Sequence, residues 1–449
     1  MLIFPDSADR VRTLIKEAQR MRETLPEYVK RENMSKSIPR IQGVPMLWRA
    51  QVIRAERLPS LLKWAGGKEQ ELRHILPMLP HFRRYFEPFV GGGAVFFSVQ
   101  AEQKFINDKS SELIGLYRMV AENNTEFFQA LGGLLYQWQR MSQFVDTHAI
   151  DLMCMYQAYS ADECSVSKMK ENIVEFVRGH SEEFNGMFAG FFDKDSENFI
   201  REIKKNLVSK TSRMKHLENK KGKLPEDDIV ANIESALKSA FYMHLRHLYN
   251  HISAYGISQG SATAIFFLVR EHAYASMFRY NSRGEFNVPY GGISYNRKDL
   301  ARKIAYMRSP GLQQHFANTV IENMDFEAFL QKYMPGADDF IFLDPPYDSE
   351  FSTYTQNTFD KRDQERLAHY LLNHCEAKFM LVIKNTPKVY SLYSEKGLNI
   401  RAFDKKYLVS FQDRNNRESE HLMITNYEQE PNLSLWSELD TITDSELEQ

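Results

Sequence analysis

Cysteine is scarce in this sequence, and long apolar runs are missing. The 449 residues include three cysteines, Cys154, Cys164 and Cys375, and the spacing of the first two fits neither a disulfide framework nor a pair of zinc ligands. We therefore expect no metal site, and thiols that act as small, partly buried side chains in a reducing compartment. No apolar run approaches the ~20 residues that cross a bilayer, and the N-terminus lacks the pattern of a signal peptide. These absences predict a cytoplasmic protein without a membrane segment.

A basic surplus is missing as well. The chain has 57 Lys and Arg against 59 Asp and Glu, which gives a formal net charge of −2. Proteins that bind nucleic acid often carry a positive total, but contacts to phosphates require only a local basic face. The charge balance argues mildly against a nucleic-acid partner without excluding one.

The residue pattern changes several times along a chain that is too long for one ordinary compact domain. Residues 1–57 are charged, with apolar residues at helical spacing, and predict a helical N-terminal extension. Residues 58–123 and 300–430 have α/β character and predict one domain built from two segments. Residues 124–299, helical in pattern for most of their length, predict an insertion. Residues 431–449 predict a flexible, acidic tail.

Apolar runs that are β-branched and aromatic predict the strands of the α/β domain. Five strands are expected, at residues 82–87, 104–108, 340–343, 378–383 and 420–427. Helices are expected at residues 94–102, from residue 111 onwards, and at 363–375. Within the insertion, the lysine-rich and acidic segment 215–228 predicts a charged loop.

A tetrapeptide, Asp344-Pro345-Pro346-Tyr347, directly follows the expected strand at 340–343. Ligands of open α/β sheets bind beyond the carboxyl ends of the strands. The two prolines fix the backbone and offer carbonyl acceptors without competing amide donors. A carboxylate and a carbonyl can together hold both hydrogens of an adenine amino group and favour its nucleophilic form, while the tyrosine stacks on the base. The alternative is a rigid surface turn, which Pro-Pro alone would favour.

A glycine-rich turn predicts a second ligand-binding element. This turn joins an expected strand to an expected helix, where a ligand can approach the backbone closely. It contains Glu87, Pro88, Phe89, Gly91 and Gly93. An acid, Asp108, ends the next strand about twenty residues on, the spacing at which acids meet ribose hydroxyls. This pair predicts a cofactor that carries a nucleoside. NAD is the second candidate, although Phe96 occupies the position of the third glycine in its fingerprint.

Two further segments suit a charged ligand and DNA. The loop around Trp64 and Lys68, with two glycines between them, suits a cover over a charged ligand, although a capped turn is the alternative. The residues Arg279, Tyr280 and Asn281, with Arg283 beside them, flank an expected hairpin tip. Arginine and asparagine suit base edges in the major groove and tyrosine suits stacking, although exposed hairpins often carry such residues.

Four segments in this order resemble the Dam-type family of DNA adenine-N6 methyltransferases. The segments are Lys63–Lys68, Glu87–Gly93, Arg283–Pro289 and Asp344–Tyr347, and the resemblance covers about residues 58–123 and 261–427. It implies an α/β fold with a Rossmann-like methyltransferase sheet and helices on both faces. Combined with the helical pattern of residues 124–299, it predicts a mostly helical insertion and target-recognition domain there. It also implies that S-adenosylmethionine donates the methyl group and that a flipped-out adenine of double-stranded DNA accepts it.

The resemblance assigns roles to individual residues. The residues expected to touch the cofactor are Trp64, Lys68, Glu87, Pro88, Phe89, Gly91, Gly93, Asp108 and Asp344. The residues expected to hold the adenine are Asp344, Pro345, Pro346 and Tyr347. The residues expected near DNA are Arg279, Tyr280, Asn281, Arg283, Asn385, Arg414 and Arg417.

Two departures from the family pattern concern recognition. The connection after Tyr117 is longer by about a domain's worth of helix, and Ala275-Ser276 stands where many members carry Asn-Gly. The insertion is expected either to extend target recognition or to dock a partner such as a restriction or defence component. The alternatives for the whole chain are methylation of RNA adenine or of cytosine N4, or a non-catalytic DNA-binding protein.

Overall fold

The computed structural model describes residues 58–186, 194–346, 359–406 and 418–428. These residues all belong to one compact unit, which spans Arg49–Gln449. The expected N-terminal extension and acidic tail lie outside the described residues.

A seven-stranded sheet forms the centre of the α/β part, in the order β3-β2-β1-β4-β5-β7-β6. The first five strands are parallel, whereas β7 runs antiparallel to both β5 and β6. The strands are β1 (Arg84–Glu87), β2 (Gln103–Asn107), β3 (Thr319–Glu322), β4 (Phe340–Leu343), β5 (Lys378–Lys384), β6 (Asn399–Lys406) and β7 (Glu418–Thr425). All five expected strands are present, and β3 and β6 are additions that the sequence analysis missed.

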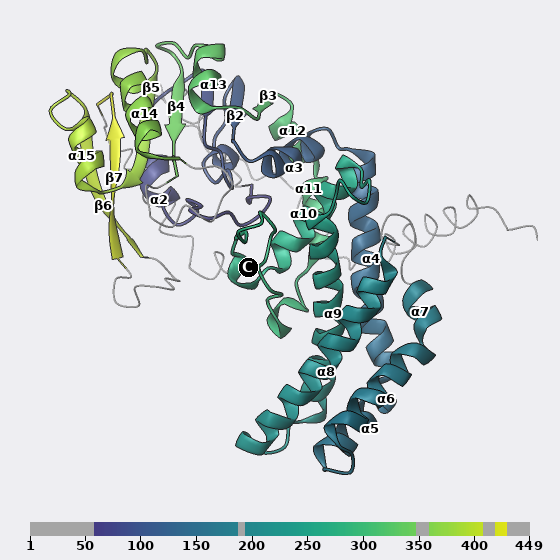
Figure 1. The fold of residues 1–449 in the computed structure, drawn as a ribbon. Helices are drawn as coiled ribbons and strands as arrows, with labels where there is room; N and C mark the ends of the chain where they lie inside the picture. Colours follow the sequence, from purple (N-terminus) through teal and green to yellow (C-terminus); the bar gives the residue numbers. More distant parts are fainter. Residues whose placement is uncertain (1–57, 187–193, 347–358, 407–417, 429–449) are drawn as a thin grey trace, which may run out of the picture. The chain divides into compact units, whose positions relative to one another are not determined.

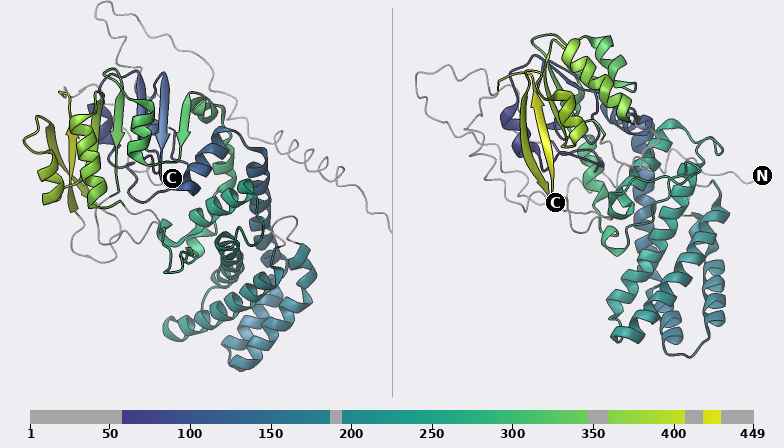
Figure 2. Two further views of the ribbon diagram at one scale, coloured as in Figure 1. Left: turned by 45° about the horizontal axis from the view of Figure 1, so that its top comes forward. Right: turned by 60° about the vertical axis from the view of Figure 1, so that its left-hand side comes forward.

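Side chains of the central strands are buried on both faces of the sheet, which explains their continuous apolar composition. Tyr85 and Phe342 belong to the buried cluster on one face, and Phe86 and Leu343 belong to the cluster on the other. Helices cover both faces, as Figure 2 shows. The expected Rossmann-like sheet with helices on both faces is confirmed.

The helices outside the insertion are short. The set comprises α2 (Leu72–Ile75), η3 (Leu76–Met78), η4 (Phe96–Ser98), α3 (Ser111–Ala121), α11 (Leu300–Met307), α12 (Pro310–Phe316), α13 (Phe326–Tyr333), α14 (Lys361–Asn373) and α15 (Pro387–Tyr393). Helices α13, α14 and α15 contribute Phe329, Leu367 and Tyr393 to the cluster around Phe86, so they share one face of the sheet.

The insertion lies in the connection between β2 and β3 and consists mainly of long helices (Figure 1). Its elements are α4 (Thr125–Thr147), α5 (Ala149–Ser160), α6 (Val166–Gly179), α7 (Ser181–Gly186), α8 (Ser196–Lys221), α9 (Glu226–Asn250), α10 (Gln259–His272), η6 (Tyr274–Ser276) and η7 (Ile293–Tyr295). Helix α9 packs against α4, α8 and α10. Leu134 and Leu245 join the same buried cluster as Tyr85, so the core of the insertion is continuous with one face of the sheet.

Two expected elements are wrong. The helix expected at residues 94–102 is only the short η4, because Val99 is already extended and fully buried among aromatic neighbours of low helix propensity. The charged loop expected at 215–228 shrinks to residues 222–225, because lysine and glutamate are good helix formers and α8 continues until Gly222, whose φ of 92° ends it.

Cys164 and Cys375 are partly buried as expected, but Cys154 is exposed on α5. Among the described helices, none combines the length and the apolarity that a membrane crossing would require.

Candidate functional site

A cavity of about 560 Å³ opens at the carboxyl ends of β1 and β4. The strand order reverses between these two neighbours, which is the point where α/β sheets bind ligands. Twelve of the residues expected at the site line this cavity, and they are Trp64, Lys68, Glu87, Pro88, Phe89, Gly91, Gly93, Asp108, Tyr280, Asp344, Pro345 and Pro346. The fold thus brings the segments of both expected halves together.

The glycine turn after β1 has no room for side chains. Gly91 and Gly93 have φ angles of 47° and 72°, which L-residues rarely adopt. A Cβ on Gly93 would lie 2.6 Å from the Tyr117 hydroxyl, and a Cβ on Gly91 would lie 3.1 Å from the Trp64 ring. The Tyr117 hydroxyl also donates to the Gly91 carbonyl at 3.0 Å. Helix α3 and the Trp64 loop therefore hold the turn from two sides.

Glu87, the last residue of β1, brings a buried carboxyl to the cavity wall. Its side chain is 2% exposed and accepts a 2.7 Å hydrogen bond from the Tyr85 hydroxyl. Burial, assisted by the negative charges of Asp344 and Asp108, raises the pKa of Glu87 well above its ordinary value. A cation in the cavity would favour the ionised form of this carboxyl.

Asp108 follows β2 and is held by the backbone. Its Oδ2 accepts from the Gly91 amide at 3.1 Å, and its Oδ1 accepts from the Ser110 amide at 2.9 Å. Burial raises the pKa of Asp108, and these backbone hydrogen bonds counteract part of that rise. Each carboxylate oxygen retains a lone pair for a hydroxyl of a bound ligand.

Lys68 and Asp344 form an ion pair that joins the first expected segment to the last. The Lys68 ammonium lies 2.5 Å from the Asp344 carboxylate and also donates to the Gly66 carbonyl at 3.0 Å. Lys68 is almost completely buried, whereas the Asp344 side chain is 18% exposed. Because a carboxylate accepts several hydrogen bonds, Asp344 can bind Lys68 and a ligand at the same time.

Three phenylalanines form an aromatic wall in the cavity. The ring centroids of Phe89 and Phe326 are 5.3 Å apart, and those of Phe89 and Phe359 are 5.5 Å apart. Phe326 is the first residue of α13, and Phe359 lies just before α14. Flat aromatic faces at this spacing suit contact with a planar ring of a ligand.

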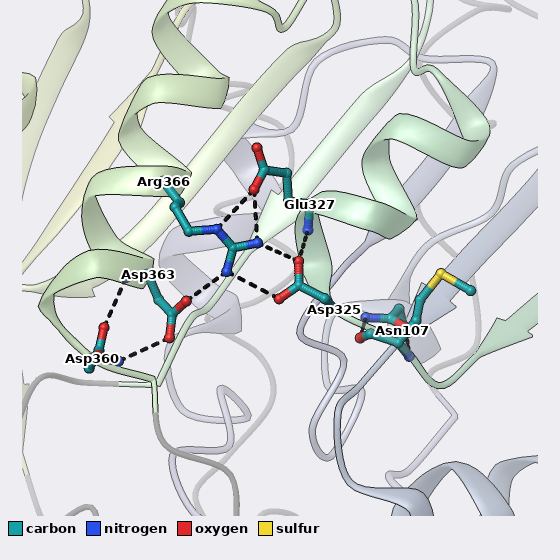
Figure 3. Close-up of polar contacts among 7 residues, drawn as sticks. Asn107, Asp325, Glu327, Asp360, Asp363 and Arg366 are labelled. Carbon is teal, nitrogen blue, oxygen red and sulfur yellow. Dashed lines mark hydrogen bonds and ion pairs between the residues drawn. The ribbon is translucent and has the colours of Figure 1, made fainter.

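Asp325, which lines the cavity next to Phe326, belongs to a network centred on Arg366 of α14 (Figure 3). The guanidinium contacts Asp325 at 2.6 Å, Glu327 at 2.8 Å and Asp363 at 2.7 Å. Burial alone would raise the pKa of Asp325, but hydrogen bonds and the charge of Arg366 outweigh it and lower the pKa. Arg366 also stacks on Phe326 at 4.9 Å, so it orients both the carboxylate and the ring.

Asn107 at the end of β2 fixes the loops on either side of the cavity. Its amide nitrogen donates to the carbonyls of Pro88 and Met324, both at 3.0 Å, and its oxygen accepts from the Met324 amide at 2.9 Å. This buried side chain ties the glycine turn to the segment that carries Asp325.

The expected hairpin is a tight turn with a single bridge between Tyr280 and Phe286. The Asn281 carboxamide accepts from the Arg283 amide at 2.9 Å and the Glu285 amide at 3.0 Å, so it shapes the turn itself. Gly284, with a φ of 76°, completes the turn. Arg283 at the tip remains exposed.

Helix α9 of the insertion supports this hairpin. Tyr242 and Arg246 donate to the Val288 carbonyl at 2.9 and 3.0 Å. Asn250 exchanges two hydrogen bonds with the backbone of Phe286. The insertion and the hairpin are therefore one packed structure.

Some expected residues do not line the cavity. Arg279 is exposed and donates to Asn287, and Arg283 and Asn281 lie in the hairpin turn. Asn385 is half-buried directly after β5, one strand beyond Asp344. Tyr347, Arg414 and Arg417 lie outside the described residues.

Several lining residues were missed by the sequence analysis, and the chief ones are Asn107, Phe278, Asp325, Phe326 and Phe359. Asp325 had a usable signal, because it closely follows the short strand β3 as Asp108 follows β2. That strand is only partly buried and was not recognised.

The sheet and its cavity define a Rossmann-like methyltransferase. The chain belongs to the D12 class of N6 adenine-specific DNA methyltransferases, a family that it matches over residues 64–230 and 192–409. It is 24% identical over 377 residues to the type II methyltransferase M.CviBI of Paramecium bursaria Chlorella virus NC1A, a match that covers 82% of this chain and 100% of the relative. It is 24% identical over 333 residues to the DNA adenine methylase of Escherichia coli K12, covering 73% of this chain and 80% of the relative. The expected family is confirmed, and the chain is an adenine-specific DNA methyltransferase.

Proposed function

We propose that the cavity binds S-adenosylmethionine beside a flipped-out adenine of duplex DNA, and that Asp344 and Pro345 hold the adenine amino group during methyl transfer. The observation that carries this proposal is the convergence of the glycine turn, Glu87, Asp108 and the start of the tetrapeptide on one cavity. We assign catalysis to a domain formed by residues 58–123 and 300–430, and target recognition to residues 124–299.

The chemistry of the lining residues fits this cofactor. Glu87 suits the cofactor's ammonium group, and Asp108 suits its ribose hydroxyls. The aromatic wall suits the adenine ring of the cofactor, and the Asp325 carboxylate beside Phe326 suits the exocyclic amine of that ring. S-adenosylmethionine, when bound, supplies an electrophilic methyl group. A Cβ on Gly91 would crowd the Trp64 ring at 3.1 Å, so glycine at this position lets the ring lie close against the turn.

The residues at the end of β4 would act on the target base. The Asp344 carboxylate accepts one amino hydrogen, and the Pro345 carbonyl accepts the other. These acceptors would favour the pyramidal nitrogen, which is a preorganised electrostatic effect. Its lone pair would bond to the methyl carbon as the sulfur–carbon bond breaks, and the Asp344 carboxylate would accept the proton that the nitrogen then releases. Lys68 holds Asp344 in position through the 2.5 Å ion pair. Tyr347 is proposed to stack on the base, as the resemblance implies.

Double-stranded DNA is the proposed substrate, with Arg279, Tyr280, Asn281, Arg283, Asn385, Arg414 and Arg417 as the residues near it. Tyr280 lines the cavity while Arg279 and Arg283 are exposed, so the hairpin would bring DNA close to the cavity. The insertion is also proposed to dock a restriction or defence partner. No contact among the described residues favours this role.

The test is to incubate the purified full chain with labelled S-adenosylmethionine and duplex DNA, then digest the DNA and identify the labelled nucleoside. N6-methyladenine in DNA is expected. Label in N4-methylcytosine alone, or label in RNA but not in DNA, would contradict the proposal. Methylation-sensitive sequencing of DNA from cells that express the chain would then give the target sequence.

A further inference from the structure

Arg270, near the end of α10, is a buried arginine that reaches both the cofactor loop and the base of the hairpin. It is 3% exposed. One terminal nitrogen donates to the Lys63 carbonyl at 3.1 Å. The other donates to the Met277 carbonyl at 2.9 Å and, at 3.4 Å, to the Ser276 carbonyl. A single side chain thus joins two segments that lie about 210 residues apart in the sequence.

The same guanidinium stacks on two rings of the cavity wall. Its centre lies 5.1 Å from the Trp64 ring and 4.4 Å from the Phe278 ring, and these two rings are 5.2 Å apart. Trp64 in turn packs against Gly91 of the glycine turn, and Phe278 packs against Tyr280 at 5.0 Å. A continuous series of contacts therefore runs from the glycine turn through Arg270 to the hairpin.

The turn that Arg270 holds has an unfavourable backbone. Ala275 and Ser276 have φ angles of 52° and 51°, in the left-handed region that disfavours residues with a Cβ. Asparagine and glycine adopt this conformation more easily than alanine and serine do. The carbonyls that accept from Arg270 belong to Ser276, the second of these two residues, and to Met277, which follows it. The hydrogen bonds from Arg270 thus stabilise a turn whose residues do not favour the left-handed conformation.

The charge of Arg270 makes no direct ion pair with any described residue, although the negative charge of the neighbouring Glu271 favours the protonated form. Among the described residues, no Asp or Glu lies within ion-pair distance of its guanidinium. Burial lowers the pKa of Arg270 to about 10, so the side chain stays protonated at neutral pH. Carbonyls and aromatic faces solvate the charge, and both kinds of partner belong to the cofactor loop and the hairpin. A shift of either segment therefore changes the environment of the charge.

We propose that Arg270 is a positioning residue that couples occupancy of the cofactor cavity to the placement of the DNA-reading hairpin. The proposal rests on the function proposed above and adds a regulation of that site. A ligand that orders Trp64 against the glycine turn fixes the Arg270 guanidinium, which fixes the Met277 carbonyl and the Phe278 ring. DNA bound to the hairpin acts through the same contacts in the opposite direction, because coupling between two sites is reciprocal.

The test measures this coupling with S-adenosylhomocysteine as a non-reacting probe. Its Kd is determined by calorimetry for the full chain alone and with saturating substrate duplex, for the wild type, Arg270→Met, Arg270→Lys and Arg118→Met. Arg118 is the matched control, since it also donates to a backbone carbonyl, that of Ile321 at 2.9 Å, but lies outside the cavity lining.

The wild type and Arg118→Met should bind the probe about tenfold more tightly when DNA is present, a size typical of coupled sites. Arg270→Met should bring this ratio close to one, and Arg270→Lys should restore part of it because lysine keeps the charge but reaches fewer carbonyls. The inference would be overturned if Arg270→Met kept the same ratio as the wild type. It would also be overturned if DNA left the affinity of the wild type for the probe unchanged. If Arg270→Met fails to fold, an unchanged ratio in Arg270→Lys overturns it instead. Failure of the wild type to methylate DNA would contradict the proposed function itself, so the two failures are distinguishable.

Discussion

Replacement of Gly93 by alanine tests whether the glycine turn is shaped for a ligand. The φ of 72° costs an alanine roughly 1–2 kcal/mol. The new Cβ would also lie 2.6 Å from the Tyr117 hydroxyl and 3.1 Å from the Phe97 ring, an overpacking that costs about 1–3 kcal/mol. The expected loss in the free energy of unfolding is therefore about 2–5 kcal/mol. Displacement of Tyr117 would also break its hydrogen bond to Gly91 and lower the affinity for S-adenosylmethionine.

Gly66→Ala is the matched control for this variant. Gly66 lies in the Trp64–Lys68 loop with a φ of 79°, but no atom lies within 4 Å of a Cβ built there. An alanine there is disfavoured only by the positive φ, so a loss of roughly 1–2 kcal/mol in the free energy of unfolding is expected. Thermal unfolding and calorimetric titration with the cofactor would compare the two variants. Equal stability and equal cofactor affinity for both would refute the argument that packing around Gly93 shapes the cavity.

Three further predictions concern charge and strain near the cavity. The pKa of Glu87 is raised and a bound cation favours its ionised form, so cofactor affinity should fall by up to about tenfold per pH unit as pH drops below that pKa. The affinity of Glu87→Gln for the cofactor should not change with pH over this range, and the same pH dependence in Glu87→Gln as in the wild type would contradict the role of Glu87. Arg366→Met should raise the KM for the cofactor with little change in kcat and cost only about 1 kcal/mol of stability, because the ion pairs are partly exposed; an unchanged KM would show that Asp325 needs no such partner. Ser276→Gly should raise stability by about 1 kcal/mol by relieving a positive φ, and a lower melting temperature would contradict strain at that turn.

The centre of the sheet was predictable because its chemistry is local. Apolar runs fixed the position of β4, and the acids at or beyond the strand ends, Glu87, Asp108 and Asp344, identified the edge of the sheet that binds ligands. The element after the glycine turn was not predictable in the same way. Its residues 95–99 are shaped by burial against α3 and α12, and tertiary packing overrode the helical pattern.

The residues that orient the site were harder to find. Arg270 resembles any charged residue near the end of a helix, and only the folded chain brings it to Lys63 and Met277. Arg366 likewise has its partner Asp325 some 41 residues away. Positioning residues act through contacts that are distant in sequence. The cavity residues at the ends of β1, β2 and β4 were found from the local pattern, whereas the lining residues outside those strand ends, such as Phe326 and Phe359, were not.

Asp344 is proposed to hold the adenine amino group during methyl transfer. The most direct measurement compares the wild type with Asp344→Ala for two quantities, the rate of N6-methyladenine formation in duplex DNA and the Kd for S-adenosylmethionine. Loss of a preorganised acceptor should slow methylation by about 10²–10³-fold, while the cofactor still binds through Asp108, the glycine turn and the aromatic wall. Methylation at the wild-type rate in Asp344→Ala would contradict this role of Asp344.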